Sequence, residues 1–281
     1  MRISSSVQPS LLLVPLTLAA AVAMAQIAHR AAPRAPSATR GLAVLQHFND
    51  SLPRNRGNAL RCTSCHLDDG KRGTAMSWIG VTTRYPKYRS RRGSIETIEQ
   101  RVNECVARSL AGRMLPVDGA AMRDIVAYLD SLKTEPLPTR PDTVRLIGDT
   151  VRGARAYQAT CTRCHAATSG GGAIAPAVFG VRSYSIGAGM SRQNTLATFL
   201  RWNMPYDKPG TLEAQDAADI AAYVLRQPRQ DHPGKEHDWP NGDAPADVAY
   251  ATDGARAKGV VLPPARPLLR RRVAPAAQGT P

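Results

Sequence analysis

Apolar residues recur at helical spacing in two segments of the chain that resemble each other. Residues 122–132 (MRDIVAYLDSL) and 217–226 (AADIAAYVLR) both carry aliphatic side chains three and four positions apart, with a tyrosine at the same place. Further helices are predicted over residues 40–51 and 150–160, and from Ser94 through Cys105, the last started by a capping box near Thr97. The pattern predicts an all-α chain built from two similar units.

Composition divides the chain around these helices. Residues 134–146 are rich in proline at their start, which is typical of an exposed, semi-rigid linker. We therefore expect an N-terminal domain over residues 26–133 and a C-terminal domain over residues 147–250. Residues 251–281 are rich in Pro, Ala and Arg without a periodic apolar face, and this composition predicts a disordered tail.

The first 25 residues have the pattern of a cleaved secretory signal. Arg2 precedes an apolar run from Leu11 to Val22, and Ala23-Met24-Ala25 forms a small-x-small cleavage site. The run is shorter than the roughly 20 residues that span a bilayer, and no later segment is apolar enough to do so. We expect a periplasmic protein without stable membrane insertion.

Charge and composition suggest an anionic ligand and a bound apolar group. The chain has 281 residues, a formal net charge of +15 and only 5% aromatic residues. Such a composition makes a thin core, which a large apolar prosthetic group would complete. Export argues against a nucleic-acid partner. The arginines near both ends are typical of solvated tails, whereas the cluster between Arg84 and Arg108 favours a site for an anion.

Four of the five cysteines lie in two C-x-x-C-H motifs, Cys62-Thr-Ser-Cys65-His66 and Cys161-Thr-Arg-Cys164-His165. This spacing lets two thiols bond to one porphyrin while the adjacent histidine binds the iron. A zinc site would need a second ligand pair, which neither motif has nearby. A redox dithiol would need a strand before it and a helix opening at the first cysteine, but turn-prone sequence follows both motifs. The chain is therefore expected to carry two covalently bound haem c groups.

The spacing of sulfur residues extends the repeat. Cys105 lies thirty-nine residues after His66, and Met204 lies thirty-nine residues after His165; both can bind iron. The order of helix, haem motif, loop, distal ligand and closing helix is similar to that of class I cytochrome c domains, here two in tandem.

Alternatives remain for both distal ligands. Met190 is a rival to Met204, although it could instead pack against the porphyrin edge. Met114 is a rival to Cys105, and Cys105 could also be a buried, inert thiol.

The surroundings of Cys105 favour chemistry. Arg101 and Arg108 lie four residues before it and three after it, on the same helix face. Such cations stabilise a thiolate, and guanidinium groups bind oxyanions in a bidentate manner, which suits a sulfur oxyanion. Thiolate ligation lowers the reduction potential of a haem and methionine ligation raises it. Electrons would therefore pass from the haem of the first motif (haem 1) to the haem of the second motif (haem 2).

Several stretches between residues 40 and 250 are similar to the dihaem thiosulfate dehydrogenases, some of which act as tetrathionate reductases. The resemblance implies oxidation of two thiosulfates to tetrathionate, with His66 and Cys105 on the active haem and His165 and Met204 on the second. The difference in potential between the two haems suggests an external redox partner, for which we expect another cytochrome c. Together with the charge pattern the resemblance suggests Cys105 as the nucleophile, and Arg91 and Arg101 as ligands of the sulfonate. The stretches are Leu60–Leu67, Tyr85–Arg89, Arg101–Ser109, Gly187–Met190, Asn203–Pro205 and His237–Gly242.

Three other functions remain open. A haem subunit of the multienzyme sulfur-oxidising system would share a Cys-ligated haem and this type of Arg-x-Asn-x-Cys sequence. A dihaem electron carrier would have no substrate of its own. A dihaem peroxidase would need acid/base side chains near an open haem, and the chain has few spare histidines.

Overall fold

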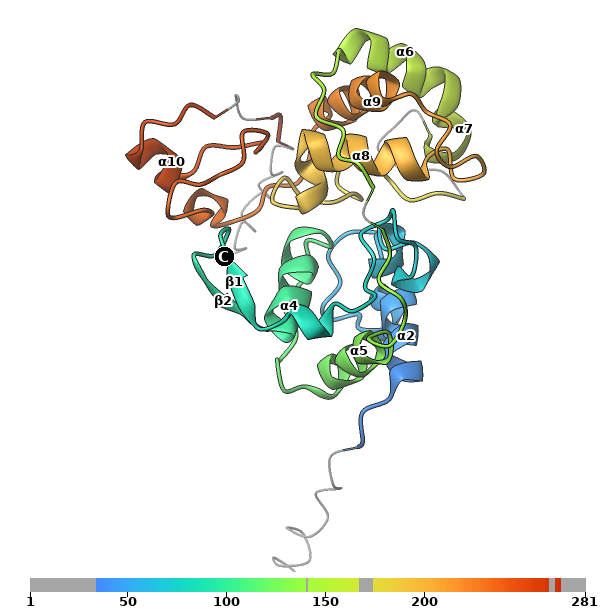
Figure 1. The fold of residues 1–281 in the computed structure, drawn as a ribbon, viewed down its shortest axis with the longest axis vertical. Coiled ribbons are helices and arrows are strands. Elements are labelled where there is room, and N and C mark those ends of the chain that lie inside the picture. Colours follow the sequence, from blue (N-terminus) through green and yellow to red (C-terminus); the bar gives the residue numbers. More distant parts are fainter. Residues whose placement is uncertain (1–33, 140, 167–173, 263–265, 269–281) are drawn as a thin grey trace, which may run out of the picture. The chain divides into compact units, whose positions relative to one another are not determined.

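The computed structural model describes residues 34–139, 141–166, 174–262 and 266–268 (Figure 1). The expected signal sequence, residues 1–25, lies outside the described residues, as do residues 269–281 of the expected tail. Two strands pair as a hairpin, and the other elements are helices. The helices are α2 (Ala38–Gln46), α3 (Phe48–Ser51), α4 (Ile98–Arg108), α5 (Ala120–Ser131), α6 (Thr150–Thr160), α7 (Thr162–His165), α8 (Gln193–Asn203), α9 (Ala214–Arg226) and α10 (Asp253–Ala257), and the strands are β1 (Lys87–Arg89) and β2 (Ser94–Glu96).

In the first half, α2 packs against α5 (Figure 1). The two helices approach so closely at Gly41 that a Cβ atom there would lie 1.9 Å from the carbonyl oxygen of Asp124. Beside this contact, Arg40 Nε donates to the Asp124 carboxylate at 2.8 Å. Glycine is required at this position because no other side chain fits between the two backbones.

The second half repeats this crossing. Helix α6 packs against α9, and a Cβ on Gly153 would lie 1.9 Å from the carbonyl oxygen of Asp219. Arg152 Nε donates to the Asp219 carboxylate at 2.6 Å. The helices predicted over 150–160 and 217–226 are observed as α6 and the greater part of α9. The similarity of the two amphipathic segments therefore reflects the same helix crossing, formed twice.

The helix expected from Ser94 begins later than predicted. Ser94 lies in β2, which pairs antiparallel with β1 so that Tyr88 faces Ile95. Helix α4 starts at Ile98. Thr97 Oγ1 accepts a hydrogen bond from the Gln100 backbone amide, and the Gln100 side-chain oxygen accepts one from the Thr97 backbone amide. The capping box near Thr97 is thus present, but it follows a short hairpin that the helical pattern did not reveal.

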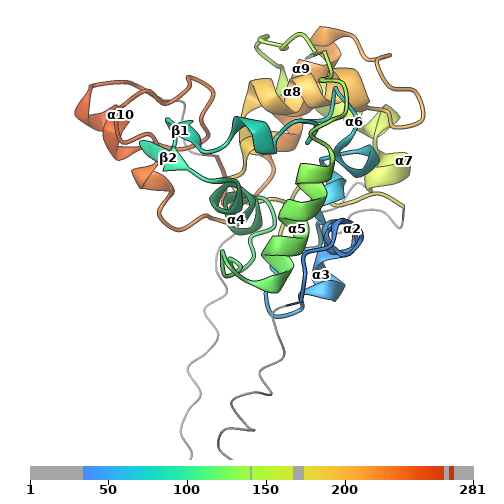
Figure 2. The same ribbon diagram turned by 60° about the horizontal axis from the view of Figure 1, so that its bottom comes forward.

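The segment after α9 is ordered further than its composition indicated. Helix α10 lies within residues 251–262, which were expected to be disordered. Before it, a small apolar cluster around Trp239 and Tyr250 packs the segment into the fold. The segment lies beside the hairpin in both ribbon views (Figures 1 and 2), and Asn241 Nδ2 donates to Tyr88 Oη at 2.8 Å. This order depends on contacts with distant residues, which composition does not report.

The two halves share one apolar core. Within residues 37–281, which form one compact unit, a single cluster of buried side chains includes Leu45 and Ile125 from the first half and Tyr157 and Ile220 from the second. No helix in the described part of the chain is long and apolar enough to cross a membrane.

Candidate functional site

The first C-x-x-C-H motif follows α3 and orients its histidine by a backbone contact. His66 Nδ1 lies 2.7 Å from the carbonyl oxygen of Met76, and the His66 ring stacks on Trp78 with 4.7 Å between the centroids. Burial lowers the pKa of His66 to about 4, so the ring is neutral at pH 7. A neutral imidazole that donates its Nδ1 hydrogen to a carbonyl oxygen leaves Nε2 unprotonated and available as a metal ligand.

The second motif has the same histidine geometry. Cys161 ends α6, Cys164 and His165 lie in α7, and His165 Nδ1 is 2.9 Å from the carbonyl oxygen of Pro176. In both motifs the acceptor therefore lies ten or eleven residues after the histidine. This shared orientation is what two proximal haem ligands require.

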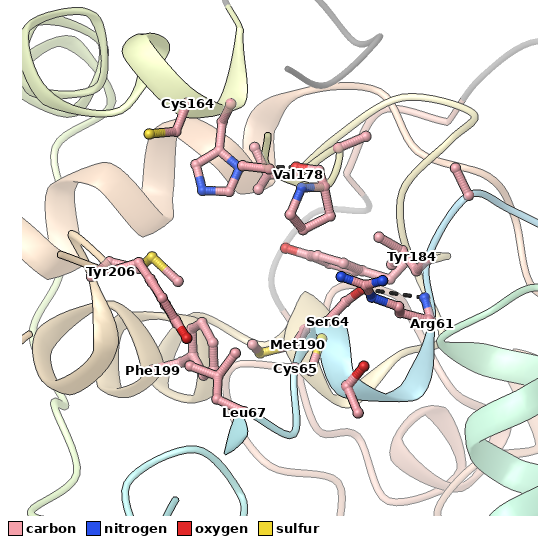
Figure 3. A pocket seen from close by; sticks show the side chains of 18 of the residues that line it. Arg61, Ser64, Cys65, Leu67, Cys164, Val178, Tyr184, Met190, Phe199 and Tyr206 are labelled. Carbon is pink, nitrogen blue, oxygen red and sulfur yellow. Dashed lines mark hydrogen bonds between the residues drawn. The ribbon is translucent and has the colours of Figure 1, made fainter. Parts of the chain in front are cut away.

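A cavity of about 1430 Å³ is lined by residues of both halves (Figure 3). Its lining includes Cys65 from the first motif and Cys161, Cys164 and His165 from the second. In Figure 3, Cys164 lies on one side of the cavity, while Cys65 and Met190 lie on the other. Aliphatic and aromatic side chains supply much of the remaining wall, among them Leu67, Val178, Leu196, Phe199, Leu200, Ile220 and Val224.

One polar group in the wall of this cavity, the hydroxyl of Tyr184, fits a porphyrin that carries carboxylates. Tyr184 lines the cavity and is 5% exposed, and its buried hydroxyl has no hydrogen-bond partner among the described residues. The Arg229 guanidinium stacks on the Tyr184 ring, 4.1 Å from its centroid, and is fully buried. Burial lowers the pKa of Arg229 and lowers that of Arg266 to about 10. Neither arginine lines the cavity or forms an ion pair with a carboxylate of the described residues, and both donate to backbone carbonyl oxygens instead.

Both candidate methionines line this cavity. Met190 is 7% exposed, and Met204 caps the C-terminus of α8 and is half-buried. Met114, the rival to Cys105 in the first half, is 63% exposed. A side chain so open to solvent is a poor candidate for a buried iron ligand.

Cys105 and Arg101 lie together on α4, next to the first motif. Arg101 Nη2 is 3.2 Å from Cys105 Sγ. Burial raises the pKa of Cys62 and that of Cys65 to about 12, and the charge of Cys105 adds to both shifts, which reflects how near these thiols are to one another. Arg101 in turn contributes to the lowered pKa of His66. The expected neighbours of the first haem are therefore gathered in one place.

The equal spacing of Cys105 and Met204 does not reflect equal positions in their helices. Cys105 lies inside α4, one turn before its end at Arg108, whereas Met204 follows the last residue of α8. The spacing therefore agrees only because the segment between motif and helix is longer in the first half, residues 67–97, than in the second, residues 166–192, which offsets the earlier position of Cys105 in its helix. What favours Cys105 in the structure is its position beside the first motif.

A second cavity, of about 400 Å³, is lined by six arginines and two glutamates. Four of the arginines are neutralised by carboxylates within 4 Å. Arg91 and Arg101 form no ion pair with the described residues. Burial lowers the pKa of Arg91, which shows how poorly its charge is compensated there. The paired arginines are Arg89 with Glu96, Arg92 with Glu104, Arg108 with Glu104 and Asp238, and Arg192 with Asp247.

The comparisons with known proteins agree with this arrangement. Residues 53–134 match the SoxA/TsdA cytochrome c domain, and residues 148–224 match the family described as cytochrome c oxidase, cbb3-type, subunit III. The thiosulfate dehydrogenase of Psychrobacter arcticus is 38% identical over 223 residues, which are 74% of this chain and 68% of that protein. That of Allochromatium vinosum is 37% identical over 213 residues, 69% of this chain and 78% of that protein.

The chain belongs to the thiosulfate dehydrogenase family.

A solved structure extends the likeness to the fold. The chain is similar to thiosulfate dehydrogenase (TsdBA) from Marichromatium purpuratum in its as-isolated form, with a TM-score of 0.68 and 27% identity. The match covers 82% of this chain and 56% of that one. The predicted fold class, all-α with two tandem cytochrome c-like domains, is confirmed, as are covalent binding of haem c and membership of an oxidoreductase family.

Within this family fold, the second cavity (the arginine cavity) is held together by residues that the sequence did not single out. The Arg91 guanidinium stacks on Trp239, 4.5 Å from the ring centroid, and Arg91 Nη1 donates to the carbonyl oxygen of Gly187 at 2.9 Å. Arg108 forms a bidentate pair with Asp238, at 2.8 and 2.7 Å. Asp238 and Trp239 lie in the stretch His237–Gly242 that resembled the family, but no role for this stretch could be inferred from its residues.

Proposed function

We propose that the chain oxidises two thiosulfate ions to tetrathionate at Cys105. The observation that carries the proposal is the contact between Arg101 and Cys105, 3.2 Å, next to the first C-x-x-C-H motif. Arg91 and Arg101 both line the arginine cavity and form no ion pair with a carboxylate in the described part of the chain, so this cavity favours a doubly charged anion. The relatives are named for thiosulfate, and the cavity suits its sulfonate oxygens.

The ligands that we propose are His66 and Cys105 for the first haem, and His165 and Met204 for the second. Bound haem c supplies one-electron acceptors, so two such groups would together take the two electrons of the reaction. Support comes from the matching orientation of both histidines and from the position of Met204 in the wall of the large cavity.

The chemistry of the protein is a sulfur-transfer sequence on Cys105. The Cys105 thiolate forms a bond to the outer sulfur of the first thiosulfate, and two electrons leave, which gives a cysteine S-thiosulfonate with one negative charge. The outer sulfur of a second thiosulfate then attacks the adduct at the sulfur bonded to Cys105. The bond to Cys105 breaks, tetrathionate leaves with two negative charges, and the thiolate is restored. Arg91 and Arg101 would bind the sulfonate oxygens throughout.

An external cytochrome c would accept the electrons, and a periplasmic location would follow from the expected signal over residues 1–25. We propose the domain boundaries 26–133 and 147–250; the matched regions are residues 53–134, which extends one residue beyond the first domain, and residues 148–224, within the second.

The test is a steady-state assay of the purified holoprotein with thiosulfate and an artificial acceptor, run in both directions. Cys105→Gly is expected to abolish turnover because it removes the sulfur that forms the adduct, while both haems stay attached through the thiols of the C-x-x-C-H motifs. Met114→Leu, which changes an exposed sulfur residue of the same half, is the matched control and should keep full activity. An active Cys105→Gly protein would contradict the mechanism, and haem reduction by thiosulfate alone would exclude a pure electron carrier.

A further inference from the structure

The loop after the first haem motif forms two hydrogen bonds with the residue just before Met204. Thr74 Oγ1 donates to Asn203 Oδ1 at 2.8 Å, and Asn203 Nδ2 donates to the Thr74 carbonyl oxygen at 3.0 Å. Asn203 is the last residue of α8 and is fully buried. A reciprocal pair of this kind fixes both the position and the rotation of the amide.

The same loop also contacts the chain on the other side of Met204. The Arg72 guanidinium lies over the Tyr206 ring, 5.0 Å from its centroid, and Arg72 is itself held by the Asp68 carboxylate at 2.8 Å. Contacts from residues 72 and 74 thus bracket Met204 on both sides in the sequence.

The same loop also contacts the histidine of the first haem motif. Two residues after Thr74, the carbonyl oxygen of Met76 is the group that orients His66, at 2.7 Å. One short segment therefore contacts the proposed proximal ligand of the first haem and the residue next to the proposed distal ligand of the second.

Helix termination alone does not account for the bonds to Thr74. The Met204 amide already donates to the Leu200 carbonyl oxygen, and Asn203 Nδ2 also donates to the Phe199 carbonyl oxygen at 3.0 Å. Both contacts lie within α8 and would close its last turn without any help from the first half. The bonds to Thr74 are additional, and they cross between the halves.

We propose that Thr74 and Asn203 are positioning residues that hold Met204 as a ligand of the second haem, and that they tie its placement to the loop that orients His66. The inference rests on the proposed ligation by Met204. A thioether is a weak iron ligand. Loss of the hydrogen bonds between Thr74 and Asn203 should therefore leave Met204 detached from the iron for part of the time. Loss of the hydrogen-bond partner of a buried amide lowers the equilibrium constant for the arrangement with Met204 bound by about tenfold.

The test compares full-length holoproteins by the near-infrared absorption band of methionine-ligated ferric haem c and by the midpoint potentials of both haems. Thr74→Val removes the hydroxyl donor, and Thr74→Ser restores it. Thr82→Val is the matched control, because the Thr82 hydroxyl forms a 3.0 Å bond to Asp130 within the first half only. Thr74→Ala serves as a second variant if the valine protein does not accumulate.

We expect Thr74→Val and Asn203→Ala to weaken the methionine band and to lower the potential of the second haem. Thr74→Ser and Thr82→Val should match the wild type. Because both residues form one contact, the double variant should show no more than the larger single effect. A Thr74→Val protein with an unchanged band and potentials would overturn the inference. Absence of the band in the wild type would instead refute the ligation by Met204 on which the inference rests.

Discussion

Substitution of Asp238 by asparagine should loosen the C-terminal segment that closes the arginine cavity. The carboxylate binds both terminal nitrogens of Arg108 and accepts from Tyr250 Oη at 2.6 Å. Arg108 is 8% exposed and Asp238 is 4% exposed, so the pair is shielded from water. The neutral amide keeps the shape of the side chain but leaves Arg108 with Glu104 as its remaining anionic partner.

The size of the effect follows from this burial. Loss of one partner of a buried ion pair costs about 3–5 kcal/mol, and the remaining contact with Glu104 places the cost of Asp238→Asn at about 3 kcal/mol. For a protein of this size, that corresponds to a fall of about 6–12 °C in the apparent melting temperature. The KM for thiosulfate should rise more than kcat falls, because Trp239, which follows Asp238, stacks on Arg91.

The assay is thermal unfolding of the holoprotein followed by circular dichroism, together with steady-state kinetics. Asp253→Asn is the control, since Asp253 lies in the same segment but its contacts with Arg256 and His237 are exposed, and no measurable shift is expected. A melting temperature of Asp238→Asn equal to that of the wild type would refute the claim that this pair holds the segment in place.

Two further predictions concern packing and haem ligation. Gly153→Ala should lower the melting temperature in thermal unfolding by several degrees, because its Cβ would lie 1.9 Å from the Asp219 carbonyl oxygen and overpacking costs about 1–3 kcal/mol. An unchanged melting temperature would show that α6 and α9 can move apart without loss of stability. Met204→Leu should abolish the near-infrared methionine band, whereas Met190→Leu, at a methionine of the same cavity wall, should retain it. The reverse result would assign the ligand to Met190.

The sequence predicted the elements whose signals are local. Apolar periodicity located α6 and most of α9, and the C-x-x-C-H spacing marked both haem motifs. The charge pattern together with the family resemblance pointed to Arg91 and Arg101, which prove to be the two cavity arginines without an ion pair in the described part of the chain. These signals survive because each depends on residues a few positions apart.

The features that the sequence did not reveal depend on long-range contacts. The hairpin of β1 and β2 has three residues in each strand, turns at Gly93 with φ +67°, and packs against Pro240. Strands so short leave no alternating pattern to read. The pair of Thr74 with Asn203 joins residues 129 positions apart, so no local pattern could indicate it.

The central claim is that Cys105 binds the iron of the first haem, within reach of thiosulfate. Low-temperature electron paramagnetic resonance of the ferric holoprotein tests it most directly, with Cys105→Gly for comparison. We predict two low-spin signals, one of them typical of thiolate ligation and lost in the glycine variant while the other stays unchanged. Two signals that both survive the substitution would show that another residue caps the first haem, and the account of a thiosulfate-oxidising cysteine would be wrong.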